Sequence, residues 1–554
     1  MAGPLMDPVV IVGAGPVGQT TALLLARWGV PSTVLDQRLE RDRVGSKALC
    51  QHRDVLDVWE AVGAGAAVAA EGVTWTTART FHRDRELFSY VFSEPGRPAF
   101  PPFVNISQTR TEEILDERIA LEPLVDVRWG HRVSALAQDG EGVDVECAVG
   151  DDTVRLRAPY VVVCAGARSD ELRRLLGVSF AGQSFDDRFL IADIRADLPG
   201  WASERRFYFD PAWNPGRQVL IHPCPDSVYR IDWQVPADYD LAEETASGAL
   251  DRRIRQIVGD ADYEVVWSSV YRFHSRQVDR MRVGRVLVAG DAAHLVSPFG
   301  ARGLNSGVAD AENAAWKLAY VLHGWAPGTL LDSYHDERHA AAAENIAVTT
   351  ATMDFLVPPD ALRAARRADV LARAAHDEAV RAHVDSGRLA EPFWYVDSPL
   401  TSADPTRPFG GRPERGTVPP AAPGVLVPDA PVLAPDGERT RLRGLARDGY
   451  LLLLAPGATP ETEQAVRDAA AAAAGPARVL ALAEVDPAGG LVAALGARAG
   501  EVWVIRPDAH VAAVLDRPDT DRVAAVLARA SARSATADAD PQPRPQPAST
   551  HADR

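Results

Sequence analysis

Three glycines with the spacing G-x-G-x-x-G, Gly13, Gly15 and Gly18, are the first residues of the chain that could bind a ligand. They lie in residues 8–18, which have the pattern of a buried strand and a tight turn before a helix. Gly13 would permit the turn, Gly15 would let a pyrophosphate approach the backbone, and Gly18 would allow close helix–strand packing. Asp36 ends the next strand, at the spacing of an acid that binds an adenosine ribose. The pattern predicts a dinucleotide site.

A second motif, residues 290–319, passes from an acid through a glycine-containing loop into a helix. Asp291 follows an apolar run, at the carboxyl end of a parallel strand, where such folds place ligands. Its carboxylate can bind a polyol such as a ribityl chain. The loop from Pro298 to Asn305 presents backbone N–H groups at a helix start, which favours an electron-rich carbonyl or an anionic ring. FAD carries both a ribityl chain and such a ring.

The elements that must position these motifs differ in hydrophobic pattern. Residues 8–18, 158–169 and 284–294 are expected to form central parallel strands, because they are apolar on both faces. Residues 73–106 and 179–276 are rich in aromatic and β-branched residues with polar alternation, which is typical of antiparallel strands with one wet face. A parallel, nucleotide-binding domain is therefore interrupted twice by pieces of a sheet domain.

Helices are expected over residues 305–323 and 333–350, with Asn305 or Ser306 as the cap of the first. The predicted fold class is α/β, with the following parts: a Rossmann-type dinucleotide-binding domain with a helical extension (1–72, 107–178 and 277–401), an antiparallel, α+β substrate-binding sheet domain (73–106 and 179–276), a Pro- and Gly-rich linker (402–432), a small α/β domain (433–531) and a disordered tail (532–554).

Composition excludes several classes of function. The 554 residues carry a net charge of −17 without a basic block, which argues against a nucleic-acid partner. No run of about 18 apolar residues predicts a membrane span. The four cysteines are far apart and match no metal-ligand spacing, which favours reduced thiols in a cytoplasmic protein and no metal site.

The motifs resemble those of the para-hydroxybenzoate hydroxylase superfamily, which are single-component FAD-dependent aromatic monooxygenases. The resemblance covers about residues 8–530 and rests on "GAGPVG" with Asp36, on "CAGARS" at 164–169, and on "AGDAAHLVSPFGARGLNSGVADAENAAWKLA". It is strongest to phenol, hydroxyphenylpropionate and polyketide hydroxylases with a C-terminal thioredoxin-like domain. Residues 433–531 would then be such a domain, here without any cysteine, and would serve packing or a homodimer.

The resemblance implies a role for each matching residue. Gly13, Gly15 and Gly18 would bind the pyrophosphate of FAD, Asp36 the ribose, and Arg38 would lie beside the adenosine. Lys47 would face the phosphates, Gln108 the ribityl or flavin edge, Asp291 the ribityl chain, Pro298 the reactive flavin edge, and Gly303, Leu304 and Asn305 the pyrimidine end. One position departs from the family pattern: Ala165 stands where relatives have an acid linked to FAD and nicotinamide interactions.

The implied reaction uses NAD(P)H to reduce FAD and dioxygen to form a flavin hydroperoxide, which hydroxylates a small aromatic, phenolic or polyketide-like substrate. Tyr271, Tyr208 and His222 are candidates to hydrogen-bond or deprotonate a phenol. Tyr271 is the first choice among them, because its strand leads toward the Pro298–Asn305 loop, called the flavin loop below. Each of the three has the alternative of being a core or surface residue. His294 is expected to be structural, under the cofactor.

Two alternative functions remain open. The first is a Baeyer–Villiger or epoxidising flavin monooxygenase that acts on a polycyclic intermediate. The second is a flavin-bound protein without efficient redox turnover, for which Ala165 is the only support.

Overall fold

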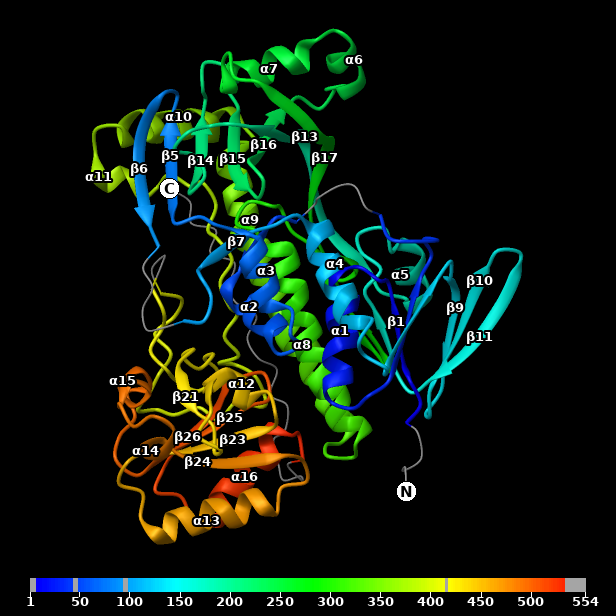
Figure 1. Ribbon diagram of the computed structural model, residues 1–554, viewed down its shortest axis with the longest axis vertical. Coiled ribbons are helices and arrows are strands. Elements are labelled where there is room, and N and C mark those ends of the chain that lie inside the picture. The colour runs from blue at the N-terminus through cyan, green and yellow to red at the C-terminus, as the bar shows by residue number, and fades with distance from the viewer. Residues whose placement is uncertain (1–5, 43–47, 93–97, 414–416, 534–554) are drawn as a thin grey trace.

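The computed structural model describes residues 6–42, 48–92, 98–413 and 417–533 of the chain. Lys47 and residues 534–554 of the expected tail therefore lie outside the described residues. The chain forms three regions, with helix α8 near their centre (Figure 1). Among the described residues, no helix is both long and apolar enough to span a membrane.

A six-stranded, mainly parallel sheet forms the core of the dinucleotide-binding region. Its order is β18(Arg282–Val283), β19(Val286–Val288), β12(Val161–Val163), β1(Val9–Val12), β2(Ser32–Asp36) and β8(Val125–Trp129). The three predicted parallel strands are neighbours in it, and β18 alone of the six pairs antiparallel. Their side chains are buried throughout, which explains the unbroken apolar runs.

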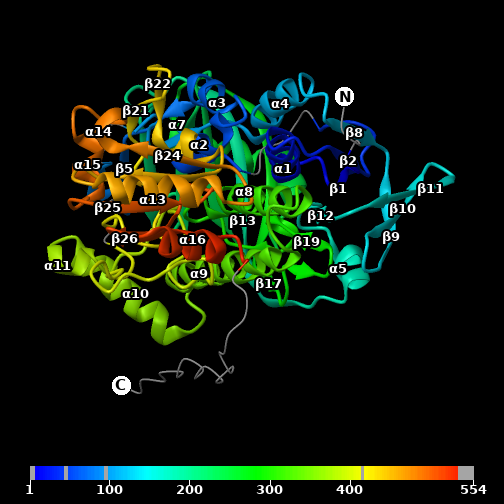
Figure 2. The same ribbon diagram turned by 90° about the horizontal axis from the view of Figure 1, so that it is seen from below.

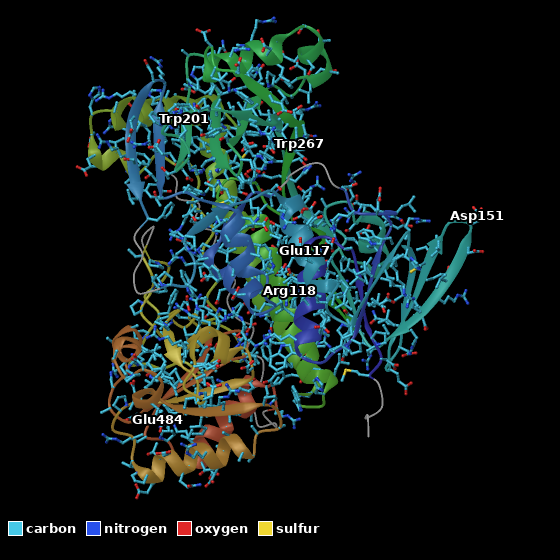
Figure 3. The ribbon with its side chains drawn as sticks, viewed as in Figure 1. Glu117, Arg118, Asp151, Trp201, Trp267 and Glu484 are labelled. Carbon is cyan, nitrogen blue, oxygen red and sulfur yellow. The ribbon has the colours of Figure 1, made fainter. Side chains whose placement is uncertain are left out.

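Helices cover this parallel sheet. Helix α1(Pro16–Arg27) packs against α4(Gln108–Ile119) and α8(Arg302–Leu322). The other elements of this region are β3(Cys50–His52), α2(Arg53–Glu60), α3(Gly65–Glu71), β4(Val73–Thr74), β7(Phe103–Asn105), α5(Asp170–Leu176), η1(Gly290–Ala292), η2(Gly328–Leu331) and α9(Asp332–Leu356). An antiparallel sheet, β9(Arg132–Gln138), β10(Val143–Val149) and β11(Asp152–Ala158), projects from it, with Asp151 at its tip (Figure 3).

Strands from both predicted sheet segments lie in one eight-stranded sheet. Its order is β20(His294–Leu295), β17(Tyr263–Val278), β13(Phe180–Ala196), β16(Val228–Val235), β15(Gln218–Cys224), β14(Glu204–Phe209), β5(Thr77–His82) and β6(Arg85–Val91). One pair differs from the antiparallel expectation: β14 runs parallel to β5, because the chain leaves the sheet between them and returns. Four further helices belong to this end: α6(Leu241–Ala246), α7(Ala249–Val258), α10(Ala361–Ala374) and α11(Glu378–Arg381).

Helix α8 begins earlier than the sequence suggested. Ala301 precedes it in the left-handed conformation, with φ +56°, and the helix starts at Arg302. The predicted cap at Asn305 or Ser306 is therefore wrong. Asn305 instead accepts a hydrogen bond from the His52 backbone N–H at 2.8 Å and donates one to the Cys50 carbonyl at 2.9 Å, which ties α8 to β3.

The C-terminal region has a four-stranded sheet in the order β24(Ala477–Ala481), β23(Tyr450–Leu454), β25(Glu501–Ile505) and β26(Val511–Asp516). A parallel unit, β23–α13(Pro460–Ala471)–β24, precedes an antiparallel hairpin and helix α16(Thr520–Ala530). The remaining elements are β21(Pro431–Leu433), β22(Arg439–Arg441), α12(Leu442–Ala446), α14(Leu482–Val485) and α15(Gly490–Leu495). The α/β fold class is confirmed, and the specific likeness to thioredoxin stays a prediction.

One face of the C-terminal sheet packs on α8 as well as on its own helices. Trp316 and Tyr320 of α8 share a hydrophobic cluster with alternate residues of β23 and with α13 and α16. The view from below shows α13 and α16 on the same side of this sheet (Figure 2). The C-terminal domain therefore covers the helix that follows the Pro298–Asn305 loop.

A buried set of charges joins the C-terminal domain to α8 and α9. This interface network consists of Lys317, Glu337, Arg506 and Asp508. Glu337 accepts hydrogen bonds from Lys317 Nζ at 2.6 Å and from Arg506 Nη1 at 2.5 Å. Arg506 also bonds Asp508 at 2.6 Å. Burial opposes ionisation, but Arg506 and Lys317 hold the pKa of Glu337 well below its usual range.

Candidate functional site

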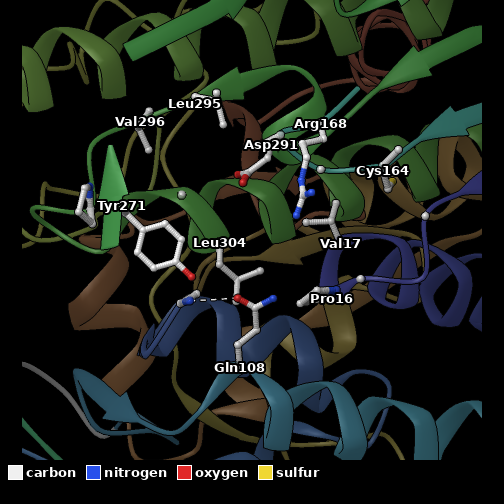
Figure 4. A pocket seen from close by; sticks show the side chains of 18 of the residues that line it. Pro16, Val17, Gln108, Cys164, Arg168, Tyr271, Asp291, Leu295, Val296 and Leu304 are labelled. Atoms are coloured by element: carbon white, nitrogen blue, oxygen red, sulfur yellow. Dashed lines mark hydrogen bonds between the residues drawn. The ribbon is translucent and has the colours of Figure 1, made fainter. Parts of the chain in front are cut away.

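A cavity of about 1060 Å³ extends from the glycine turn to the eight-stranded sheet. Both regions contribute residues to its wall. Figure 4 shows Tyr271 of the sheet and Gln108, Asp291 and Arg168 of the dinucleotide-binding region pointing into this space. This volume slightly exceeds the usual range for a single small ligand, about 300–1,000 Å³, as expected if a dinucleotide and a second molecule share the cavity.

The glycine turn at one end of the cavity requires residues without side chains. Gly13 has φ +110°, and a Cβ there would lie 2.5 Å from the Cys164 carbonyl oxygen. A Cβ on Gly18 would lie 1.9 Å from the Gly13 carbonyl oxygen, so Gly18 serves helix–strand packing and does not line the cavity. Gly15 lines the cavity and precedes the first turn of α1, whose free N–H groups favour an anion.

Asp36 and Arg38 form the next part of the wall. Asp36 ends β2 and accepts hydrogen bonds from Arg38 Nε at 3.0 Å and Arg38 Nη2 at 2.9 Å. The Ala14 backbone N–H donates to it at 2.8 Å. Burial acts to raise the pKa of Asp36, but the bonds from Arg38 and Ala14 outweigh it and lower the pKa below its ordinary value. An ionised acceptor therefore lies where the sequence predicted one.

Gln108, the first residue of α4, also lines the cavity. Its Oε1 accepts from the Ala48 backbone N–H at 3.0 Å, and its Nε2 donates to Glu112 Oε1 at 2.8 Å. These bonds hold the amide in place at the edge of the cavity (Figure 4).

The predicted ring-binding loop lies together with Asp291 on the far side. Asp291 is exposed to the cavity, and Pro298, Gly303, Leu304 and Asn305 line it as well. These residues follow β19 through the short helix η1. The parallel strand end, the acid and the helix start therefore meet as the sequence predicted.

A buried carboxylate supports this loop from below. Asp310 accepts from the Gly290 backbone N–H at 2.9 Å and from Arg338 Nε at 2.7 Å. His294 Nε2 lies 2.8 Å from the same carboxylate, and neither His294 nor Asp310 lines the cavity. Burial acts to raise the pKa of Asp310, but Arg338 and His294 outweigh it and lower the pKa. His294 thus has a structural position beneath the loop.

The structure separates the three candidate catalytic residues. Tyr271 and His222 line the cavity, whereas Tyr208 does not. The Tyr208 ring stacks on Phe81 at 4.6 Å, and its hydroxyl accepts from Arg206 at 3.3 Å. Alternation along β14 explains this placement, because neighbouring residues of a strand point to opposite faces.

The cavity residues that the sequence reasoning missed include Arg205, Arg230 and Asp232. They lie on β14 and β16, and each was hidden in an ordinary alternating strand pattern. Only the pairing of strands shows that they share one face with His222. A charged residue at an inward position of a strand was the available signal, but the inward face was not yet known.

Comparison with known proteins identifies the family of this site. The model of the FAD binding domain family matches residues 6–349, which contain the glycine turn, Asp36, Asp291 and the Pro298–Asn305 loop. The chain belongs to that family. The expected membership of the para-hydroxybenzoate hydroxylase superfamily is confirmed. FAD is the cofactor of this site.

Two relatives and one solved structure illustrate the similarity. The chain is 32% identical over 368 residues to a 3-(3-hydroxy-phenyl)propionate/3-hydroxycinnamic acid hydroxylase of Mycobacterium sp. (strain KMS), covering 66% of this chain and 62% of that protein. It is 33% identical over 379 residues to a rifampicin monooxygenase of Streptomyces venezuelae, covering 65% of this chain and 74% of that protein. The flavin-dependent monooxygenase PieE, solved with FAD and substrate, has a TM-score of 0.83 at 23% identity, covering 96% and 100%. This last likeness concerns the fold alone.

The residues of the cavity fit FAD. A Cβ on Gly15 would have no other atom within 4 Å, so open space lies beside the N-terminus of α1. Asp36 offers an ionised acceptor near that end, and Asp291 faces the cavity between it and the Pro298–Asn305 loop. The glycine turn and Asp36 would therefore take the pyrophosphate and ribose of FAD, Asp291 its ribityl chain, and the Pro298–Asn305 loop its ring.

Proposed function

We propose that this protein is an FAD-dependent monooxygenase that uses NAD(P)H and dioxygen to hydroxylate an aromatic, phenolic or polyketide-like substrate. The supporting observation is that one cavity joins the residues expected to bind FAD to a chamber on the eight-stranded sheet, whose wall carries both aromatic and charged side chains. Phe189, Leu220 and Phe273 line that chamber. The Pro298–Asn305 loop would hold the flavin ring at the opening of this chamber, and the names of the relatives agree with this reaction.

Bound FAD would supply hydride acceptance from NAD(P)H and the activation of dioxygen. The protein would exclude water and hold the substrate ring in position. Phe189 stacks on Phe273 at 4.5 Å and contacts Phe299 of the flavin loop at 5.2 Å, which closes this wall with aromatic rings. Tyr271 is the proposed hydrogen-bond partner of a phenolic oxygen, with His222 as the second candidate and Tyr208 no longer one.

Ala165 supports the alternative of a flavin protein without efficient turnover. It lines the cavity at the position where the family pattern implies an acid, close in sequence to Arg168, which points into the cavity (Figure 4). Loss of that acid would weaken the docking of a nicotinamide cofactor. Baeyer–Villiger insertion or epoxidation would use the same cavity and differ in the product.

Anaerobic stopped-flow reduction of the FAD-loaded protein by NADPH and by NADH tests the proposal. It is run with and without phenols, naphthols and hydroxyanthraquinones. Rapid reduction that one ligand accelerates, followed by oxygen-dependent product, supports a monooxygenase, and the product structure separates hydroxylation from insertion or epoxidation. Absence of reduction with every donor and ligand contradicts the proposal and favours the non-turnover protein.

The C-terminal domain is proposed to serve packing, since it covers α8 through the interface network. A homodimer and a cytoplasmic location stay predictions. Light scattering coupled to size-exclusion chromatography of the full chain tests the dimer.

A further inference from the structure

Charged side chains form a row across the cavity face of the eight-stranded sheet. Strand register places Asp193 of β13 opposite Arg230 of β16, and Arg230 opposite His222 of β15. Arg206 of β14 pairs with Ile221 of β15, so the preceding residue, Arg205, lies opposite His222 and extends the row. Asp193, Arg230, His222 and Arg205 are all buried. We call these four residues and Asp232 the cavity cluster.

Asp232 lies one step along the same face. It is two residues after Arg230 on β16, where Ile191 and Leu220 are its cross-strand neighbours. Asp232 lines the cavity between these two apolar side chains. The carboxyl group therefore interrupts an otherwise apolar part of the chamber wall.

Hydrogen bonding within the cavity cluster is uneven. Arg230 donates to both oxygens of Asp193, at 2.7 and 2.8 Å, so this pair is bidentate. Asp232 Oδ1 and His222 Nδ1 are buried and have no hydrogen-bond partner among the described residues. Burial raises the pKa of Asp232 to about 7, against the opposing effects of Arg230 and Arg205. A carboxyl group left so poorly solvated destabilises the free protein.

The charges of the cavity cluster indicate which kind of ligand group would stabilise the unpartnered Asp232 carboxyl group. Arg205 and Arg230 are positive, and Asp193 and an ionised Asp232 are negative, so the two signs balance. Burial, with Arg205 and Arg230, holds the pKa of His222 well below its ordinary value, and the ring is neutral. A carboxylate ligand would add an uncompensated negative charge. A neutral hydroxyl would instead donate a hydrogen bond to Asp232 and leave the balance intact.

Asp232 also lies away from the proposed reacting end. Tyr271 pairs with Phe189, whereas Asp232 pairs with Ile191, two residues further along β13. Strands β16 and β17 lie on either side of β13, two strand spacings apart, and the two positions differ by two residues along the strand direction. The backbones of Asp232 and Tyr271 are therefore on the order of 10 Å apart. A ligand that contacts both must therefore extend beyond a single phenol ring.

We propose that Asp232 is the polar anchor of the substrate subsite, and that the substrate is an extended aromatic compound with a hydroxyl group, remote from the oxidised ring, that donates to the Asp232 carboxyl group. This proposal rests on the proposed function. The hydroxyl keeps its proton in the bound state, so no covalent step is involved. Asp232 is thus a specificity-determining residue, and Arg205 and His222 border the same subsite.

The test measures binding of matched ligand pairs to the FAD-loaded protein by isothermal titration calorimetry at pH 8. One pair is 4,4′-dihydroxybiphenyl, whose hydroxyl groups keep their protons at pH 8, and its monomethyl ether. The other is dihydroxynaphthalene and its monomethyl ether. We expect at least one hydroxyl compound to bind about 10- to 100-fold more tightly than its ether, the range for a hydrogen bond to a charged group.

Variants assign this preference to Asp232. Asp232→Leu is expected to reduce it to less than about 3-fold, and Asp232→Asn, whose amide oxygen is a weaker acceptor, to an intermediate value. Asp238→Asn, an exposed carboxyl just beyond the same strand, should keep the full preference. FAD content and melting temperature are checked for each variant, and Asp232→Asn decides if Asp232→Leu does not fold.

Several results would overturn the proposal. The first is that no hydroxyl compound binds more tightly than its ether up to the solubility limit. The second is a hydroxyl preference that is unchanged in both Asp232 variants. The third is that 3-(3-hydroxyphenyl)propionate, which carries a carboxylate, binds more tightly than every other ligand. Calorimetry requires no turnover. Hydroxyl-dependent binding without NAD(P)H-driven oxygen uptake would therefore support the Asp232 subsite and contradict the monooxygenase function. Turnover that is insensitive to substitution of Asp232 would support the monooxygenase function and contradict the subsite.

Discussion

The interface network and the cavity cluster are two buried groups of charges that differ in one respect. Both oxygens of Glu337 accept hydrogen bonds, including those from Lys317, Asn313 and Ser398 at 2.5 to 2.7 Å. In the cavity cluster, Asp232 has an oxygen without a partner among the described residues. The first network is complete within the protein and stabilises the domain contact. The second leaves an acceptor free at the cavity, which we propose a ligand hydroxyl fills.

Breaking the complete network should have the largest effect. Glu337→Leu leaves Arg506 and Lys317 buried without their shared carboxylate, and we expect a loss of about 3–5 kcal/mol in the free energy of unfolding. Urea denaturation of the FAD-loaded protein measures it. Glu484→Gln, on the surface of the C-terminal domain (Figure 3), is the control and should leave the value unchanged. A loss below about 1 kcal/mol would contradict a structural role for the network.

Removing the unpartnered carboxyl should have the opposite sign. The folded-state pKa of Asp232, about 7, lies above its ordinary value of 3.8. The unfolded chain therefore ionises first, and the wild type loses stability as pH rises from about 4 to 7. Asp232→Leu should gain on the order of 2 kcal/mol at pH 8 and little at pH 4.5. Thermal unfolding at both pH values measures the gain, and an equal change at both would contradict the unpaired-carboxyl interpretation.

Loss of the Asp310 carboxylate beneath the flavin loop should weaken FAD binding, while the contact between the C-terminal domain and α8 should change less. Asp310→Asn weakens the bonds to Arg338 and to the Gly290 backbone, so the loop that carries Asp291 loses its fixed position. We expect FAD to bind about 10-fold more weakly, equivalent to about 1.4 kcal/mol. Titration of the apoprotein with FAD, followed by flavin fluorescence, measures this. Unchanged affinity would show that the loop holds its geometry without Asp310.

Substitutions in exposed ion pairs should have the smallest effect on stability. Arg157 bonds Asp139 and Asp144 on the projecting antiparallel sheet, where all three side chains are solvated. Arg157→Gln should change neither the melting temperature nor FAD affinity measurably, because water and salt screen such pairs. A clear destabilisation would mean that ion pairing itself, and not burial with complete hydrogen bonding, explains the interface network.

The sequence predicted which residues meet at the dinucleotide end of the cavity better than those at its sheet end, because the first set depends on local spacing. Gly13, Gly15 and Asp36 belong to one local strand–turn–helix–strand unit, so their spacing alone implies their geometry. Asp291 follows from the rule for parallel strand ends. The residues around Asp232 depend on strand register, and a shift of one residue exchanges the faces. Tyr208 shows this directly, since its neighbours Phe207 and Phe209 face the core.

The interface network had no sequence signal, because its members are dispersed. Glu337 and Arg506 are 169 positions apart, and neither belongs to a recognisable motif. The start of α8 was missed for a different reason. Its preceding residue, Ala301, adopts the left-handed conformation that alanine seldom takes, so the local pattern favoured the polar residues Asn305 and Ser306 instead.

Lys317 gives the protein a natural reporter of domain opening. The chain has two lysines, Lys47 and Lys317, and the Lys317 side chain is fully buried in α8 against Glu337. We expect an amine-reactive reagent to reach it only if the C-terminal domain lifts from the helix. The rate of acylation at Lys317, followed by peptide mass spectrometry of the native protein, therefore counts separations of the two domains over time, with no engineered label on the chain.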